Sequence, residues 1–535
     1  SRPIHYEGTR SDKPYGGSRF SDFYSKMYPG MKWMEENTSG LDKPMILCEY
    51  AHAMGNAVGN LGEYVEAMDN SDSTIGGCIW DWIDQAIYDP QEMKRGVYRL
   101  HTGYDYPGPH QGNFCSNGVI PATRDESPKL KEVKGAYQNV KFRFDGMTDK
   151  PLSARVTLTN EYTFRTLAGL SLEVEVTVDG VKAETYTRQL PATQPGQSVT
   201  FDLPVAVNPK AREVRGKEVI LSLRVKENSA TSYAPAGHDV AQWQFVLIPR
   251  DAMAKVKGSG PKLEVTETAA ALTVANARVK AVFERSTATL TALTLDGVDV
   301  IADGRGLTYD NHRWIENDRY TDTIPGTDPA KSQLLWRREG KNVVVSAIND
   351  GSKCGTDLVY TIYPDGTVDL SATFVPHSAD LRRAGLSAGI NPALNRVGYY
   401  AYGPMENYND RKDGAMIGRY ATVVDSMTVG YVKPQSTGGR EGLRDLVLTG
   451  ADGRGVRIET RGKVSFSILP FTDADLMNAS HQWELTPRPF NTLHLDAVTR
   501  GVGNASCGQD VDTLPKFRVP DTPQNYRLRI TPVTL

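Results

Sequence analysis

The sequence has a long region without any helical periodicity, which runs from about residue 263 to residue 535. Turn signals divide this region into short segments, at Asp296-Gly297, Asp365-Gly366 and Asp452-Gly453. Asp-Gly pairs favour the tight turns that join antiparallel strands. A region of this length without helices has to bury its apolar side chains between sheets, so we predict one large C-terminal β-sandwich over residues 263–535.

A second β region precedes it, between residues 142 and 250. Asp179-Gly180 supplies a hairpin turn after a strand in which polar residues alternate strictly with Leu170, Leu172, Val174, Val176 and Val178. A later run has the same pattern, although Ile220 interrupts it. These residues predict one β-sandwich. The stretch 251–262 is polar and contains Gly and Pro, and we predict that it is a linker.

The first 141 residues alternate apolar runs with helical periods. The run 44–50 is nearly continuously apolar up to Glu49, as in a strand that is buried on both faces. A helix is predicted next, because four apolar residues fall on one face: Leu61, Tyr64, Val65 and Met68. A second apolar run covers residues 75–82, and a later helix has Ser127 as its N-cap and Pro128 in its first position. This order predicts a parallel α/β unit.

The composition excludes several classes of protein. The chain has 61 Lys and Arg residues against 64 Asp and Glu residues, for a net charge of −3. A near-neutral balance argues against nucleic acid or an acidic membrane surface as the main partner. We find no run of about 18 apolar residues, so no membrane-spanning helix is expected.

The five cysteines are odd in number and form no CxxC pair. This argues against a disulfide framework and a structural zinc site. It also favours a reducing compartment, so we expect a cytoplasmic protein, with the periplasm as the alternative. Cys48 and Cys78 lie inside apolar runs, where a small core residue is expected.

Carboxylates end both apolar strands of the first region. Glu49 closes the first strand, His52 follows in the next loop, and the second strand ends with Trp80, Asp81, Trp82 and Asp84. The carboxyl ends of parallel strands are where α/β and barrel folds place their sites. Acids with aromatic faces suit a sugar, because the indole stacks on the ring and the acids act on the glycosidic bond. The alternative interpretation is that Glu49 is a solvated loop residue and that Trp80 and Trp82 are core residues.

Two long segments, 46–56 (ILCEYAHAMGN) and 76–85 (GGCIWDWIDQ), resemble the family-2 glycoside hydrolases, and within them the large bacterial β-galactosidases. Shorter similar segments follow in order over essentially the whole chain, at 26–28, 113–118, 402–408 and 501–503. The resemblance implies an α/β plus all-β protein. It would contain the C-terminal half of a catalytic (β/α)₈ TIM barrel (1–141), an immunoglobulin-like β-sandwich (142–250), the linker (251–262) and a β-galactosidase small-chain type sandwich (263–535).

The resemblance also implies an activity, the hydrolysis of terminal non-reducing β-D-galactose residues with retention. Glu49 matches the nucleophile that forms a covalent galactosyl-enzyme. Tyr28 matches a tyrosine that hydrogen-bonds the nucleophile, and such a bond favours the carboxylate form. His52 matches a histidine that contacts the sugar hydroxyls, and Trp80 matches the platform under galactose.

A partial sodium site is implied at Phe114, through its carbonyl, and at Asn117, which also contacts the substrate. Carbonyl and amide oxygens are ligands that a hard cation prefers. Cys507 lies at about the position where the family has a tryptophan of the sugar subsite. Tyr309-Asp310-Asn311-His312 is only loosely similar to the corresponding family segment.

The sequence begins at what resembles the fifth strand of the barrel. We therefore expect the acid/base glutamate, the Mg²⁺ ligands and one sodium ligand in an upstream N-terminal half of the same enzyme, and an inactive isolated chain. A β-galactoside substrate and a homo-oligomer are further expectations. The alternatives are another family-2 glycosidase, of the β-glucuronidase or β-mannosidase type, and a non-catalytic carbohydrate-binding or assembly module.

Overall fold

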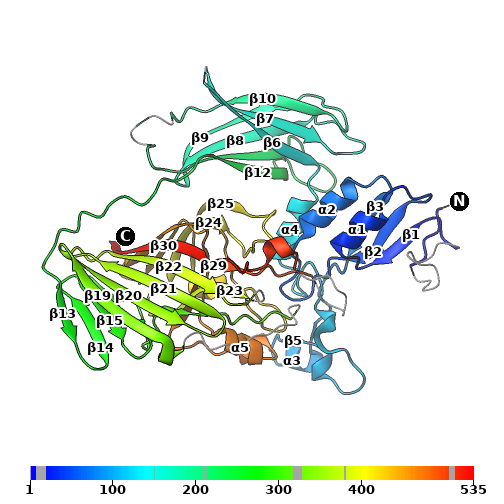
Figure 1. Cartoon of the computed structure of the whole chain (residues 1–535). Helices are drawn as coiled ribbons and strands as arrows, with labels where there is room; N and C mark the ends of the chain where they lie inside the picture. The colour runs from blue at the N-terminus through cyan, green and yellow to red at the C-terminus, as the bar shows by residue number, and fades with distance from the viewer. Residues whose placement is uncertain are drawn as a thin grey trace. The chain divides into compact units, whose positions relative to one another are not determined.

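The computed structural model describes residues 2–7, 20–149, 151–208, 211, 214–316, 328–378, 381–504 and 513–535. The fold is mostly β-sheet with few and short helices (Figure 1). The chain divides into two compact units. The larger unit comprises residues 1–132, 256–412 and 420–535, and the smaller unit comprises residues 133–255 and 413–419. Among the described residues, no helix has the length and apolar character that crossing a membrane requires.

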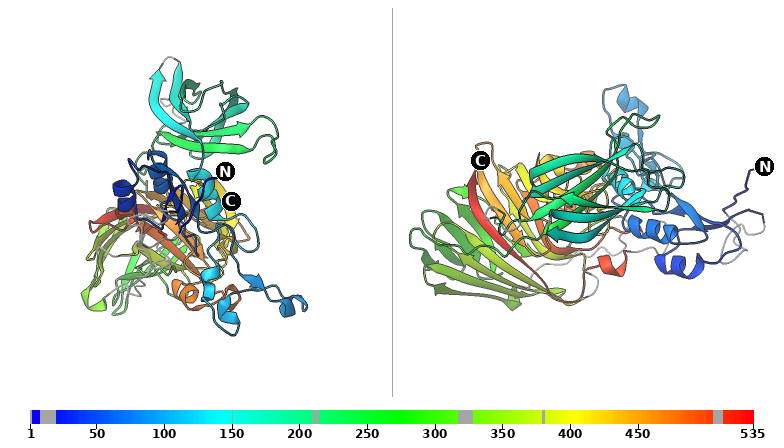
Figure 2. Two further views of the ribbon diagram at one scale, coloured as in Figure 1. Left: turned by 90° about the vertical axis from the view of Figure 1, so that its right-hand side faces the viewer. Right: turned by 90° about the horizontal axis from the view of Figure 1, so that it is seen from above.

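The larger unit begins with a three-stranded parallel sheet in the order β1 (Tyr24–Met27), β2 (Met45–Tyr50) and β3 (Thr74–Ile79). The strands alternate with helices α1 (Met31–Asn37) and α2 (Leu61–Asp69), which lie beside the sheet (Figures 1 and 2). The predicted α/β unit is therefore confirmed. The buried face of α2 also agrees with the prediction, since it consists of Leu61, Tyr64, Val65 and Met68.

This sheet is less buried than its sequence predicts. Met45 and Leu47 are fully buried, but Cys48 is half-buried and Cys78 of β3 is exposed. The prediction of a core residue is therefore wrong for Cys78. The physical reason is that α2 packs against one side of the sheet, whereas the described residues cover the other side less completely.

Short elements follow β3. They are β4 (Ile87–Tyr88), α3 (Pro90–Met93), β5 (Leu100–His101), and 3₁₀ helices at Gly103–Asp105 and Gly112–Cys115. Helix α4 (Pro128–Ala136) begins where the sequence predicts. Ser127 is its N-cap, because the Ser127 Oγ accepts a hydrogen bond from the Leu130 N–H at 3.0 Å.

The smaller unit contains two antiparallel sheets. One has the order β10 (Ser198–Pro204), β7 (Leu152–Asn160), β6 (Val140–Asp149). The other has the order β12 (Asp239–Ile248), β11 (Val219–Glu227), β8 (Leu170–Val178), β9 (Val181–Gln189). Both sheets contribute side chains to one core, among them Val156 of β7, Val174 of β8 and Leu223 of β11.

Two local features of this unit explain its sequence pattern. Asp179 and Gly180 join β8 to β9, and both have positive φ angles, 48° and 73°, as the predicted hairpin turn requires. Ile220 interrupts the alternation because β11 has an irregular register between Val219 and Ile220, and the strand is buried between two neighbours.

Three antiparallel sheets build the rest of the larger unit. The first has the order β13 (Glu264–Glu267), β14 (Ala271–Ala275), β15 (Val279–Glu284), β16 (Thr289–Leu295), β17 (Val298–Asp299). The second has the order β18 (Thr308–Tyr309), β23 (Arg383–Ile390), β29 (Asn491–Thr499), β28 (Ser465–Leu469).

The third sheet has nine strands. Their order is β19 (Ser332–Glu339), β20 (Asn342–Asp350), β21 (Cys354–Ile362), β22 (Val368–Pro376), β30 (Gln524–Thr534), β27 (Arg454–Arg461), β26 (Asp445–Thr449), β24 (Arg396–Gly403), β25 (Met416–Val423). The C-terminal strand β30 therefore lies inside the sheet (red in Figure 1).

One core joins these three sheets, with Phe283 of β15, Leu495 of β29 and Tyr360 of β21 among its members. The remaining described elements are short: helix α5 (Asp473–Asn478) and 3₁₀ helices at Pro329–Lys331, Val424–Met427, Gln482–Glu484 and Pro515–Phe517. Sheets thus dominate residues 263–535, as the missing helical period predicts.

The core of the smaller unit is tested by Leu223→Ala. Leu223 is fully buried, so its truncation leaves a cavity and is expected to lower the free energy of unfolding by about 2–5 kcal/mol. Val181→Ala is the control, because Val181 is 61% exposed. This substitution should change the free energy of unfolding by less than about 0.5 kcal/mol. Urea unfolding measures both, and equal effects would contradict the assigned core.

Candidate active site

Glu49 lies near the carboxyl end of the central strand β2, as the sequence predicts. The chain turns sharply after each of the first two strands. Tyr28 after β1 and Ala51 after β2 both have left-handed backbones, with φ of 45° and 50°. Such conformations are costly for non-glycine residues and cluster at functional sites. The Tyr28 N–H donates to the Glu49 carbonyl at 2.8 Å, which brings the two strand ends together.

His52 is fully buried between two aromatic rings. Its ring centroid lies 5.7 Å from that of Tyr28, edge-on, and 6.1 Å from that of Phe114. Asn117 Nδ2 lies 3.4 Å from His52 Nε2. Because an amide NH₂ group only donates, Nε2 is the acceptor and the imidazole proton sits on Nδ1. Burial, with a contribution from the Lys129 charge, lowers the pKa of His52 to about 4, so the ring is neutral at neutral pH.

Asn117 has one unfilled hydrogen-bond acceptor. Its Nδ2 donates to the Phe114 carbonyl at 2.8 Å, while its Oδ1 is buried without a hydrogen-bond partner among the described residues. An unsatisfied amide oxygen beside a backbone carbonyl fits a hard cation such as Na⁺. Asn113, which directly precedes Phe114, is held by Glu316: both carboxylate oxygens of Glu316 accept from Asn113 Nδ2 at 2.5 Å. Burial raises the pKa of the Glu316 carboxyl.

Trp80 directly follows β3, and backbone hydrogen bonds join it to the last residue of β2 and to the loop after β2. Its N–H donates to the Tyr50 carbonyl at 3.1 Å, and its carbonyl accepts from the Ala53 N–H at 2.8 Å. The Trp80 side chain is 40% exposed, so its ring is accessible to a ligand. The Asp81 N–H donates to the Asn117 carbonyl at 2.7 Å. The structure therefore gathers Tyr28, Glu49, His52, Trp80, Phe114 and Asn117 at one edge of the sheet, whereas Cys507 lies outside the described residues.

Sequence reasoning missed the residues that hold the loop after His52. Asn56 is 1% exposed and makes hydrogen bonds with side chains and backbone more than 350 positions away in the sequence. Its Nδ2 donates to the Tyr408 hydroxyl at 2.9 Å and to the Ser436 carbonyl at 2.7 Å. Its Oδ1 accepts from the Tyr431 hydroxyl at 3.1 Å, and its N–H donates to Gln435 Oε1 at 3.0 Å.

A buried ion pair lies behind these contacts. Arg411 Nη2 and Glu406 Oε1 are 2.6 Å apart, and both side chains are at most 1% exposed. Arg411 Nη1 also donates to the Ala57 carbonyl at 3.0 Å. Glu406 Oε2 accepts from the Thr437 hydroxyl at 2.8 Å and from the Gly438 N–H at 2.7 Å, so its charge is well satisfied.

The end of the same loop is held by backbone contacts. The Asn60 N–H donates to the Asp410 carbonyl at 2.7 Å, and the Gly59 N–H donates to the Gly503 carbonyl at 2.9 Å. The Asp410 carboxylate accepts from the Val502 and Gly503 N–H groups. A Cβ at Gly59 would lie 2.0 Å from Asp410 Oδ2, so only glycine fits there. The similar segments 402–408 and 501–503 were the only sequence signal for this network.

Lys129 is a further buried group beside the loop. It lies in the first turn of α4, is 3% exposed, and its Nζ donates to the Ala53 carbonyl at 2.7 Å. Burial lowers its pKa, while nearby acidic groups, Asp84 first among them, oppose that shift. The Lys129 side chain thus holds the carbonyl next to His52 in place.

Comparisons with known proteins agree with this arrangement. Three family models match the chain in order: "Glycosyl hydrolases family 2, TIM barrel domain" (residues 1–142), "Beta-galactosidase, domain 4" (156–248) and "Beta galactosidase small chain" (275–531). The chain therefore belongs to glycoside hydrolase family 2, as the sequence motifs predict.

Similar curated proteins include a beta-galactosidase of Priestia megaterium, 29% identical over 97% of this chain and 50% of that protein. Another is a beta-galactosidase of Streptococcus thermophilus, 27% identical over 94% of this chain and 50% of that protein. The chain thus spans about half the length of the curated relatives it matches. Among solved structures, a galactose mutarotase related enzyme from Lactobacillus acidophilus aligns with 49% of this chain and 97% of its own chain, at 10% identity and a TM-score of 0.30. This likeness is too low to carry an argument.

The ion pair behind the loop is tested by Glu406→Gln. This change leaves the Arg411 charge buried without a counter-charge, so it should lower the free energy of unfolding by about 3–5 kcal/mol. Glu36→Gln is the matched control, because Glu36 pairs with Lys32 on an exposed helix face. This substitution should lower the free energy of unfolding by less than about 1 kcal/mol. A small effect of Glu406→Gln in urea unfolding would contradict the assigned role.

The lowered pKa of His52 predicts a pH dependence of stability. Between about pH 6.5 and 4 the unfolded chain binds a proton on His52 that the native protein does not, so stability falls as the pH falls through this range. The stability advantage of the wild type over His52→Gln should therefore shrink by roughly 3 kcal/mol between neutral pH and pH 4. Urea unfolding at several pH values measures this difference, and a constant difference would argue against a neutral buried His52.

Proposed function

We propose that this chain carries the nucleophile half of the active site of a retaining β-galactosidase, which hydrolyses terminal non-reducing β-D-galactose residues. One observation carries the proposal: Glu49, at the carboxyl end of β2, shares its edge of the sheet with a neutral buried histidine, an accessible tryptophan and an unsatisfied amide oxygen. The family and the names of the relatives support the choice of galactose.

In the proposed reaction the Glu49 carboxylate attacks the anomeric carbon. A covalent galactosyl ester forms, and the bond to the leaving oxygen breaks as that oxygen takes a proton from an acid. Water then attacks the same carbon and releases galactose, which restores Glu49. Tyr28 would donate a hydrogen bond to Glu49 and hold the attacking carboxylate in position.

The other residues would bind and orient the sugar. His52, as a neutral imidazole with its proton on Nδ1, would contact the sugar hydroxyls, and the Trp80 ring would stack on the C–H face of galactose. Asn117 Oδ1 and the Phe114 carbonyl would hold Na⁺, which supplies a positive charge that orients the galactose 6-hydroxyl. Cys507 would lie near the same subsite.

A retaining glycosidase needs a second carboxyl group, about 5–5.5 Å from the nucleophile, to protonate the leaving oxygen. We propose that this acid comes from the half of the enzyme that the relatives have and this chain does not span. We assign no Mg²⁺ ligand to the described residues. Residues 1–141 would then be the C-terminal half of a (β/α)₈ barrel, with an immunoglobulin-like sandwich at 142–250, a linker at 251–262, a large sandwich at 263–535 and assembly into a homo-oligomer.

The test is hydrolysis of nitrophenyl β-galactoside by the chain, alone and together with the upstream half of a family-2 β-galactosidase. Nitrophenolate is an activated leaving group, so its departure depends little on an acid. Glu49→Gln should lower turnover at least about a thousandfold, because the attacking carboxylate is lost. Glu36→Gln, on an exposed helix face, is the control and should leave turnover unchanged.

Two results would contradict the proposal. Glu49→Gln with wild-type turnover would exclude Glu49 as nucleophile. A preference for nitrophenyl β-glucuronide or β-mannoside over the galactoside would be compatible with the retaining mechanism but would exclude galactose as the preferred sugar.

A further inference from the structure

The sheet β18–β23–β29–β28 is buried on both faces, and one of these faces is polar. Along β29, Leu493 and Leu495 belong to the hydrophobic core, while Thr492, His494 and Asp496 point to the opposite face. These three polar residues are 8%, 3% and 2% exposed. Burying polar groups costs free energy unless each finds a partner, so this face needs an explanation other than packing.

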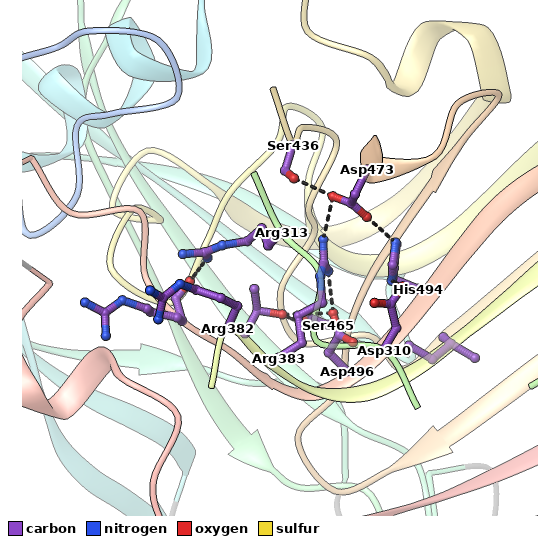
Figure 3. A network of polar contacts seen from close by, with 12 residues as sticks. Asp310, Arg313, Arg382, Arg383, Ser436, Ser465, Asp473, His494 and Asp496 are labelled. Carbon is purple, nitrogen blue, oxygen red and sulfur yellow. Dashed lines mark hydrogen bonds and ion pairs between the residues drawn. The ribbon is translucent and has the colours of Figure 1, made fainter. Parts of the chain in front are cut away.

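Two of these groups, His494 and Asp496, join a network with Arg383 and Asp473 (Figure 3). Arg383 Nη1 lies 2.7 Å from Asp496 Oδ2, and its Nη2 lies 3.6 Å from Asp473 Oδ1. Asp473 Oδ2 lies 2.9 Å from His494 Nε2. The network holds the carboxylate of Asp473 in one orientation.

A cavity of about 430 Å³ lies on this polar side. Its volume is within the ~300–1,000 Å³ range of small-molecule sites. Carboxylates, hydroxyls and a guanidinium stacked on an aromatic ring line it, including Asp310, Asp473, Thr492, Ser387, Arg305 and Phe490. None of the candidate active-site residues at the β1–β3 edge lines this cavity.

Three lining residues have hydrogen-bonding capacity that the described residues leave unfilled: Asp310, Thr492 and His312, whose Nε2 is buried without a partner. Asp310 Oδ1 accepts from the His312 N–H at 2.7 Å, but Oδ2 has only His494 Nδ1 near it, at 4.0 Å, which is too long for a hydrogen bond. Burial raises the pKa of the Asp310 carboxyl, as expected for a carboxylate short of donors. The Thr492 hydroxyl is buried with no partner among the described residues.

We propose that this cavity is a second ligand site, and that it binds a neutral polyhydroxylated small molecule, a mono- or disaccharide, with Asp310 and Thr492 as its contacts. A sugar hydroxyl can donate to the Asp310 carboxylate and accept from the Thr492 hydroxyl, which is the pair of bonds missing here. This inference goes beyond the proposed activity and does not depend on it.

The charges of the network favour a neutral ligand over a metal ion. Asp310, Asp473 and His494 come close enough together to be considered as metal ligands. However, Asp473 already has the Arg383 guanidinium 3.6 Å away and a hydrogen bond from Ser436. A cation at this carboxylate would lie close to a fixed positive charge, which is unfavourable in a buried site.

Isothermal titration calorimetry with D-galactose and with D-glucose tests the proposal. The titration uses the full chain carrying Trp80→Ala, so that the proposed active site does not contribute. Asp310→Asn should raise the dissociation constant at least about tenfold, since a hydrogen bond to a charged acceptor is lost. Thr492→Val, which keeps the side-chain shape, should raise it by a smaller factor. Asp452→Asn is the control for the charge change, because Asp452 is in an exposed turn away from the cavity.

Ala474→Trp closes the cavity from an exposed lining position without touching the charged network, and it should abolish binding. Circular dichroism melts check that each variant is folded. Sugar binding that Asp452→Asn retains and the cavity variants lose would support the proposal. No binding of either sugar at tens of millimolar, binding insensitive to the cavity variants, or binding of Mg²⁺ or Mn²⁺ alone would overturn it. None of these outcomes bears on hydrolysis at Glu49.

Discussion

Glu406 carries a carboxylate into the interior of the larger unit, where bulk water does not solvate it. The charge persists there because Arg411, two hydroxyl groups and a backbone N–H all bond to the two oxygens. Arg411 and Tyr431 then reach onward to Ala57 and Asn56, in the loop after the strand of Glu49. The position of this loop therefore depends on side chains from residues 402–440. The candidate active site is built as much by the C-terminal β region as by the parallel sheet.

This arrangement gives the large C-terminal region a physical role at the site. Its hydrophobic core draws on three sheets, which provides the burial that keeps the two charged networks in place. One network, around Glu406, fixes the loop after His52. The other, around Arg383, holds Asp473, whose carboxylate lines the cavity on the polar side of β23 and β29. Buried ion pairs of this kind contribute little to net stability, but removing one partner is costly, and so they hold the surrounding backbone in one arrangement.

The sequence predicted the features that depend on local pattern. The four apolar positions of α2, the start of α4 at Pro128 and the turn at Asp179-Gly180 are confirmed, because periodicity, capping and turn chemistry act within a few residues. The prediction that Cys78 lies in the core was wrong, because the apolar composition of a strand does not show whether another element covers it.

The loop network could not be predicted, because Asn56 meets Gln435 and Tyr408 across more than 350 residues and no local signal marks such pairs. The motifs around Glu49 did identify the candidate site, whereas the roles of its residues stay predictions. The cavity on the polar side of β29 gave no sequence signal either, because Asp310, Asp473 and Thr492 meet only after the sheets have formed.

The C-terminal region holds the loop after Glu49 in one conformation. Hydrogen–deuterium exchange at the backbone amides of Asn56, Gly59 and Asn60 tests it most directly, because each is bonded to a residue beyond position 400. We expect these amides to exchange as slowly as the hydrogen-bonded amides of strand β2. Exchange as fast as in an exposed loop would contradict it.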